Sequence, residues 1–186
     1  MAKDIDIHGI LAYPVTPFTA DDEVDTGKLA TLVDRLVDTG AHGIVPLGST
    51  GESAYLTETE YDAVIDITIN VVDGRVPGII GASELTTANT IRRAQYAQRV
   101  GADAVMVGRA SYGAPWASGT IAAGAAGRSA ANSPVTTQEM ADYIIAHYED
   151  MLALYGRESG LRQARKHLGW YLDRLGECPP QLRACI

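Results

Sequence analysis

The sequence is poor in several residue types that ordinarily mark a function. Its 186 residues include two cysteines, Cys178 and Cys185, both near the C-terminal end, so neither a disulfide framework nor a Cys-x-x-Cys metal site is predicted. No apolar run approaches the roughly 18 residues that a membrane span needs. The first residues, MAKDIDIHGI, lack the charged-then-apolar layout of a signal peptide. We therefore expect a cytoplasmic protein with no membrane segment and no bound metal.

Positive charge is scarce in the first half of the chain. Residues 1–100 hold 7 Lys and Arg against 15 Asp and Glu, whereas residues 101–186 hold 8 of each. The net charge of −8 therefore belongs to the first half. An acidic surface of this kind argues against nucleic-acid binding there. The balanced second half leaves room for a local basic face.

Four short apolar runs alternate with amphipathic helical patterns in the first part of the chain. The runs cover residues 9–15, 41–48, 76–82 and 102–108. Apolar strands separated by amphipathic helices indicate parallel βα units. A complete eight-stranded barrel takes roughly 200–250 residues. The sequence therefore predicts an α/β fold, a partial TIM barrel of four βα units (a half-barrel) over residues 1–116, followed by a C-terminal helical segment.

Capping residues mark where the predicted helices begin. Asp25 is an N-cap candidate for the first helix, which Gly40 ends. Thr57 and Glu60 form a capping box that opens the second helix. A third helical pattern covers residues 87–100.

The strand signals stop after the half-barrel. Residues 117–135 are rich in Ala, Gly and Ser and predict a linker or a weak helix. Residues 136–186 predict a helical domain, which the capping box of Thr136 and Glu139 opens and Gly156 interrupts.

The best chemical signal is PLGSTGES, residues 46–53, directly after the second predicted strand. Sites in βα barrels lie at the C-terminal ends of the strands. Gly48, Ser49 and Thr50 offer backbone N–H groups and two hydroxyls, which suit a carboxylate or a phosphate. A tight glycine-rich turn with no ligand explains the same residues equally well.

GILAYPVTPF, IVPLGSTGE, DGRVPGIIGA and GADAVMV occur in an order and spacing that resemble the first half of the dihydrodipicolinate synthase / N-acetylneuraminate lyase family, over about residues 9–107. The resemblance implies a class I aldolase or lyase that acts on pyruvate or a related 2-keto acid without a cofactor. It implies that Gly48, Ser49 and Thr50 bind the keto acid's carboxylate. Ser49 would also belong to the family's proton relay.

The family's Schiff-base lysine has no counterpart in this resemblance. That lysine ends the sixth strand of the family's barrel, whereas this chain has three lysines, Lys3, Lys28 and Lys166, none of which ends a predicted strand. Tyr112 follows the fourth strand, where the family has an active-site tyrosine, but VGRASYGAPW replaces the family's Pro-Tyr-Tyr pattern. We therefore expect an inactive lyase in which Ser49 and Tyr112 are the candidate catalytic residues.

GADAVMVGRASYGAPW and ARKHLGWY, by contrast, resemble the C-terminal part of bacterial tRNA-dihydrouridine synthases, over about residues 101–175. This resemblance implies that Gly108 and Arg109 bind the phosphate of an FMN cofactor. It also implies tRNA contact by the C-terminal helices. The tRNA-contacting candidates are Arg162, Arg165, Lys166 and His167. A local excess of Lys and Arg over residues 156–175 fits phosphate contact, as it also fits a solvated helix face.

The chain thus resembles a chimera of two families, and three function classes stay open. They are an inactive keto-acid lyase, an FMN- and tRNA-binding remnant of a dihydrouridine synthase, whose catalytic cysteine has no counterpart, and a structural module without a ligand. A half-barrel also exposes its first and fourth strands as edges. We therefore expect a homo-oligomer or an aggregation-prone chain.

Overall fold

The computed structural model describes residues 5–84, 86–129, 136–175 and 180–183, and for Arg109 and Leu182 the backbone alone. The chain divides into two compact units, Met1–Gly108 and Arg109–Ile186. The first unit therefore ends at the close of the fourth βα strand, before the boundary at residue 116 that the sequence suggested.

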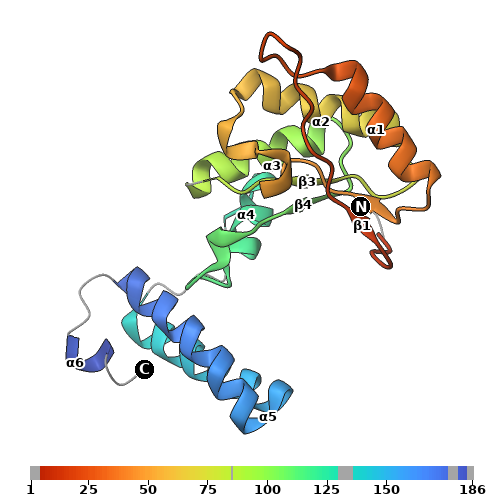
Figure 1. Ribbon diagram of the computed structural model, residues 1–186. Helices are drawn as coiled ribbons and strands as arrows, with labels where there is room; N and C mark the ends of the chain where they lie inside the picture. The colour runs from red at the N-terminus through yellow and green to blue at the C-terminus, as the bar shows by residue number, and fades with distance from the viewer. Residues whose placement is uncertain (1–4, 85, 130–135, 176–179, 184–186) are drawn as a thin grey trace. The chain divides into compact units, whose positions relative to one another are not determined.

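The first unit is built on four short strands that pair in parallel, and Figure 1 labels three of them, β1, β3 and β4. Strand β1 pairs with β2 and β3 pairs with β4, and a parallel bridge between Ile44 and Gly78 joins β2 to the β3 side. The strands therefore form two parallel pairs, β1-β2 and β3-β4, which this single bridge links. The strands are β1 (Leu11–Ala12), β2 (Gly43–Ile44), β3 (Ile79–Gly81) and β4 (Ala104–Met106).

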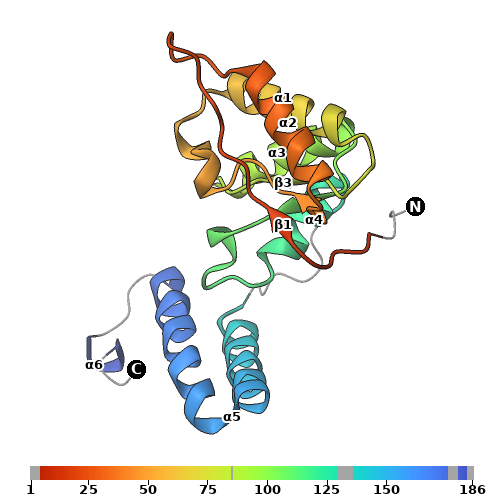
Figure 2. The same ribbon diagram turned by 45° about the vertical axis from the view of Figure 1, so that its right-hand side comes forward.

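Three helices connect these strands and lie on one side of them in both Figure 1 and Figure 2. The Asp25 side chain accepts from the backbone N of Lys28 at 2.9 Å at the start of the first helix. Both hydrogen bonds of the predicted capping box form between Thr57 and Glu60. The sequence-based prediction of these two helix starts is confirmed. The helices are α1 (Thr26–Asp38), α2 (Glu58–Val72) and α3 (Thr87–Arg99).

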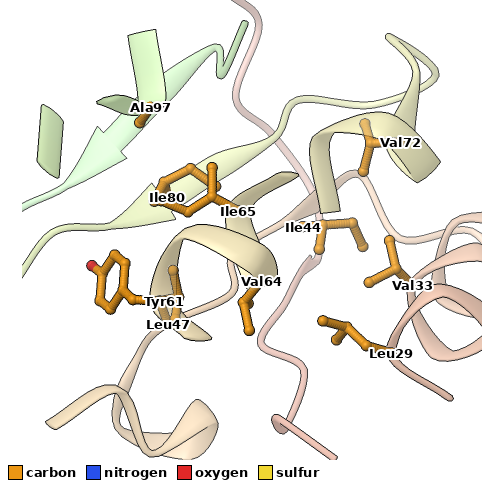
Figure 3. Close-up of a cluster of buried hydrophobic side chains, with 10 residues drawn as sticks. All are labelled: Leu29, Val33, Ile44, Leu47, Tyr61, Val64, Ile65, Val72, Ile80 and Ala97. Carbon is orange, nitrogen blue, oxygen red and sulfur yellow. The ribbon is translucent and has the colours of Figure 1, made fainter. Parts of the chain in front are cut away.

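A hydrophobic core lies between these helices and the strands (Figure 3). Removing this much apolar surface from water is the main favourable contribution to folding. No residue of the core is more than 2% exposed, which makes its side chains sensitive to truncation. The core comprises Leu29, Val33, Ile44, Leu47, Tyr61, Val64, Ile65, Val72, Ile80 and Ala97.

One buried cation ties α2 to α3 and to the loop after β3. The guanidinium of Arg93, on α3, lies 3.7 Å from the centre of the Tyr61 ring. Its Nε donates to Glu84 at 3.1 Å and its Nη1 to Asp62 at 3.3 Å. The Tyr61 hydroxyl in turn donates to the carbonyl of Gly81. Burial raises the pKa of the Asp62 carboxyl, and the positive charge of Arg93 opposes that rise.

The second unit is helical. It begins with a single turn, η3 (Arg109–Ser111), and continues into α4 (Ala117–Ala125). The segment α5 (Thr137–Leu175) breaks at Gly156, whose φ is 73°, and its two halves run antiparallel in Figures 1 and 2. A short helix, α6 (Pro180–Arg183), follows. Of the two alternatives predicted for residues 117–135, helix forms over α4, where alanine, the strongest helix former, is frequent. Residues 130–135 lie outside the described part.

Aromatic side chains hold the α5 hairpin together and fix the loop before α4 to it. Tyr112 stacks on Trp170 with ring centres 3.9 Å apart and planes 5° apart. Trp116 meets Tyr143, on the first half of α5, edge to face at 5.1 Å. Arg174 donates from Nε to the Tyr112 carbonyl at 2.8 Å. These contacts join segments far apart in the chain into one small core.

Candidate functional site

The predicted carboxylate-binding segment follows β2. It folds into two short 3-10 helices, η1 (Ser49–Gly51) and η2 (Ser53–Tyr55). Leu47 enters the turn with a φ of 63°. Thr16 donates from its hydroxyl to the carbonyl of Gly51 at 2.7 Å, and Gly51 donates to the carbonyl of Gly48 at 3.1 Å. The backbone of the turn is therefore held by one bond within the turn and one from Thr16. The side chains of Ser49 and Thr50 are exposed.

A tyrosine that the sequence analysis did not propose as a site residue lies against this turn. A Cβ built on Gly48 would lie 3.5 Å from Cδ1 of Tyr13 and 3.9 Å from Cε of Met106. The Tyr13 hydroxyl lies 3.8 Å from the Met106 sulfur. The C-terminal ends of strands β1, β2 and β4 thus lie close together at Gly48. Tyr13 could have been found from its place at the end of the first strand, which is where barrel sites are built.

Tyr112, the second catalytic candidate, belongs to the second unit, whereas Ser49 belongs to the first. Its ring is stacked on Trp170 and its carbonyl accepts from Arg174. In the described structure Tyr112 therefore packs the loop onto α5.

Neither described lysine lies at the end of a strand. Lys28, on α1, pairs with Asp25 at 2.8 Å, and its side chain is 71% exposed. Lys166, on α5, lies 5.2 Å from the centre of the Trp170 ring. Lys3 falls outside the described residues.

The Gly108–Arg109 turn, predicted to bind an FMN phosphate, adjoins the loop after β3. The backbone N of Gly108 donates to the Ser83 hydroxyl at 3.2 Å. Glu84, in the same loop, is the acid that pairs with Arg93. The side chain of Arg109 lies outside the described residues, and its backbone forms the start of η3.

The predicted tRNA-contacting residues divide into two groups on the second half of α5. Arg162, Arg165 and Lys166 are exposed, and Arg162 lies 3.7 Å from the Glu158 carboxylate. His167 is half-buried and meets the rings of His147 and Trp170 edge to face. The structure thus places three cations on the surface and the histidine inside the hairpin.

His147 and His167 also border a pocket of about 290 Å³ between the two halves of α5. The Nδ1 of His147 lies 2.8 Å from the hydroxyl of Tyr171, which is buried. Burial raises the pKa of Tyr171. Burial, and next the charges of His147 and Lys166, lower the pKa of His167 from its ordinary value. The pocket is further lined by Asp150, Met151, Leu154, Tyr155 and Gln163.

The second unit is expected to lose stability in mild acid. Because the pKa of His167 in the folded chain lies below the ordinary 6.5, protonation favours the unfolded chain. The contribution of His167 is therefore fully present above about pH 6.5 and is lost as the pH falls through the folded-state pKa. Urea unfolding followed by tryptophan fluorescence should show a lower midpoint at about pH 5 than at about pH 7.5. His167→Gln should reduce this difference, and an unchanged or higher midpoint in acid would contradict the prediction.

The described residues offer neither a metal site nor a membrane span. No group of three or more His, Cys, Asp or Glu side chains there is placed to hold a metal ion. None of the helices in that part of the chain has the length and apolar character needed to cross a membrane.

The first unit is a fragment of a TIM barrel with a polar turn at the C-terminal end of its second strand. The sequence pattern of the Dihydrodipicolinate synthetase family matches residues 6–121. The chain therefore belongs to this family, as its N-terminal motifs predicted.

Relatives and solved structures agree with this assignment. The 4-hydroxy-tetrahydrodipicolinate synthase of Methylobacterium radiotolerans is 41% identical over 116 residues, which cover 62% of this chain and 38% of that protein. Among solved structures, dihydrodipicolinate synthase from Aquifex aeolicus is 34% identical with a TM-score of 0.52, over 54% of this chain and 34% of that one. YagE, a prophage protein of the family from E. coli K12 solved with pyruvate, is 39% identical with a TM-score of 0.51, over 53% and 33%. The likeness confirms the predicted fold class.

The chain spans less than two fifths of the length of the first curated relatives it matches. A longer alignment exists with the synthase of Roseobacter denitrificans, which is 35% identical over 176 residues, covering 92% of this chain and 60% of that protein. These matches give no support to a dihydrouridine synthase origin for the second unit. That origin, and the chimera it implied, stay predictions from the motifs alone.

Proposed function

We propose that the first unit binds the carboxylate of pyruvate or a related 2-keto acid at Gly48, Ser49 and Thr50, and that it does so without forming a Schiff base. The observation that carries the proposal is the turn itself. Its backbone is held by Thr16, it presents two exposed hydroxyls, and it lies where β1, β2 and β4 end. Hydroxyl and backbone N–H groups in such a turn match the two oxygens of a carboxylate.

Schiff-base chemistry requires a lysine amine at this turn, and neither lysine of the described residues lies there. A lysine attacks a ketone as the free amine, which needs a desolvated pocket or a neighbouring cation to lower its pKa. Lys28 is instead exposed and paired with a carboxylate, and Lys166 lies beside Trp170 on a helix. The role of Ser49 is then to donate a hydrogen bond from its hydroxyl to the bound carboxylate. The proton relay of the family acts on an imine, and without a Schiff base no imine forms.

Pyruvate should bind weakly and reversibly, and Thr50→Val should abolish the binding. Saturation-transfer NMR on pyruvate measures this, with Thr59→Val, an exposed threonine of α2, as the matched control. Borohydride added with pyruvate should leave the mass of the chain unchanged, because no imine forms. A mass increase that maps to Lys28 or Lys166 contradicts the absence of a Schiff base. No saturation transfer in the unmodified chain contradicts carboxylate binding and favours a module without a ligand.

A second candidate is contact between the second unit and the phosphate backbone of tRNA, as the motifs of residues 101–175 imply. Arg162, Arg165 and Lys166 support it, because they are spaced at i, i+3 and i+4 on one helix and are exposed there. Residues at this spacing share a helix face. FMN is the cofactor that this candidate implies, at Gly108 and Arg109. The Dihydrodipicolinate synthetase family uses no cofactor, so FMN binding would favour a dihydrouridine synthase origin, whereas tRNA contact by the helix does not require FMN.

If the second unit contacts tRNA, replacing Arg162 and Lys166 by Gln should weaken tRNA binding and lower the salt slope by about one for each phosphate that is no longer neutralised. Gel shifts over a salt series measure this, with Arg35→Gln on α1 as the control. We expect no saturable quenching of FMN fluorescence, since a single turn offers no pocket for the flavin ring. Equal tRNA binding by all variants contradicts the candidate, and saturable FMN quenching contradicts the expected absence of flavin.

A further inference from the structure

Tyr13 lies against the turn at Gly48, although the carboxylate site proposed above does not use it. It directly follows β1, and its Cδ1 lies 3.5 Å from the place where a Cβ would stand on Gly48. This is ordinary van der Waals contact, so the ring covers one side of the turn without strain. Sites in βα barrels are built at this end of the strands. The position of Tyr13 therefore makes it a neighbour of any small ligand held by the turn.

The hydroxyl of Tyr13 has a poor acceptor. Among the residues that the structure describes, its one hydrogen-bond partner is the sulfur of Met106, at 3.8 Å. A thioether sulfur accepts weakly, whereas a ketone or hydroxyl oxygen accepts well. Tyr13 is 46% exposed, so its hydroxyl can exchange the sulfur for an oxygen that a ligand brings.

Two other tyrosines of the first unit have stronger acceptors. The Tyr61 hydroxyl donates to the carbonyl of Gly81, and the Tyr96 hydroxyl donates to the Asp66 carboxylate at 3.0 Å. Both acceptors are oxygen atoms of the protein, so these two hydroxyls already serve to join elements of the fold. The Tyr13 ring is held by its contacts with Gly48 and Met106, while its donor hydrogen is left for a better partner.

On the basis of the proposed carboxylate site, we propose that the Tyr13 hydroxyl donates a hydrogen bond to the oxygen on C2 of a bound 2-keto acid. Tyr13 thereby selects 2-keto acids over carboxylates that lack this oxygen. C2 is bonded directly to the carboxylate carbon, so its oxygen lies beside the group that Ser49 and Thr50 bind. The ring of Tyr13 extends from Gly48 to Met106, which brings its hydroxyl within reach of that oxygen. A polar group that pairs with a substrate oxygen disfavours analogues without it, because the group then lacks its partner.

Pyruvate and propionate test this selection directly. Both carry one carboxylate and three carbons, and propionate has hydrogens in place of the C2 oxygen. Saturation-transfer NMR titrations of the full chain should give a dissociation constant about 2- to 10-fold lower for pyruvate, the effect of one neutral hydrogen bond. Tyr13→Phe should abolish this preference by weakening pyruvate alone, because it keeps the ring on Gly48 and removes the donor. Tyr55→Phe, at a residue 85% exposed on η2, is the matched control and should keep the preference.

The outcomes separate the role of Tyr13 from carboxylate binding itself. A Tyr13→Phe variant that keeps the preference, or that loses affinity for both acids equally, overturns the role of Tyr13 and leaves the carboxylate site standing. Equal binding of the two acids by the unmodified chain has the same meaning. Binding of neither acid by the unmodified chain overturns the carboxylate site and the role of Tyr13 with it. Far-UV circular dichroism checks that both variants are folded.

Discussion

Replacing Gly113 by alanine is expected to unfold the second unit or to destabilise it by more than about 2 kcal/mol. Gly113 has a φ of 64°, which L side chains rarely adopt, and a Cβ there would overlap the carbonyl oxygen of Trp170 and lie 2.7 Å from its carbonyl carbon. The obstacle is helix backbone, so no side-chain rotation relieves it. The loop that carries Tyr112 would have to leave α5, and the stacked ring pair would separate.

Tryptophan fluorescence measures this effect selectively, because both tryptophans of the chain, Trp116 and Trp170, lie in the second unit. The urea midpoint followed by fluorescence should fall sharply in Gly113→Ala. Gly119→Ala is the matched control: a Cβ at Gly119, within α4, would meet nothing within 4 Å, so its midpoint should stay or rise slightly. Equal midpoints for the two variants would contradict the close approach of Gly113 to α5.

Ile65→Ala is expected to destabilise the first unit by about 2–5 kcal/mol. Ile65 lies on α2, its side chain is fully buried, and Figure 3 shows it among the core residues that face the strands. Truncation removes apolar contacts and leaves a cavity that neighbours on several elements cannot all fill. Urea unfolding followed by far-UV circular dichroism measures the destabilisation.

The control for this core truncation is Tyr55→Ala. The Tyr55 side chain is 85% exposed, so the change should stay within about 0.5 kcal/mol. Fluorescence reports the other unit, so its midpoint should move less in Ile65→Ala than the circular dichroism midpoint does. A destabilisation below about 1 kcal/mol would mean that Ile65 is not part of a close-packed core.

Local signals in the sequence predicted the elements of the first unit well. The cap at Asp25 and the capping box of Thr57 and Glu60 involve residues within one helical turn, so the sequence contains all the information they need. Strand bounds were less predictable. Within the apolar run 41–48, strand β2 covers only Gly43–Ile44. A strand requires hydrogen bonds to a neighbouring strand, whereas an apolar run indicates only that its residues are buried.

Long-range contacts explain what the sequence could not reveal about the site. The turn at Gly48–Thr50 can be predicted because its glycine and hydroxyls are adjacent in the chain; its part in binding stays a prediction. The end of the first strand could have indicated Tyr13, but its contact with Met106 joins residues far apart in sequence and could not be predicted. Tyr112 was assigned a catalytic part from its place after a strand, yet its stacking partner, Trp170, comes from a helix late in the chain.

The Arg93 cluster determines which parts of the first unit can open separately. One guanidinium lies on the Tyr61 ring of α2 and holds the carboxylates of Asp62 and Glu84. Local opening of α3 would leave the partly buried carboxylates of Asp62 and Glu84 without their cation, and opening of α2 would remove the Tyr61 ring and Asp62 from Arg93. Either loss costs more than breaking a surface pair. Amide protons of α2 and α3 should therefore exchange with solvent in one cooperative event. Lysine could not take the place of Arg93, because an ammonium cannot stack as a plane and donate along two directions of that plane at once.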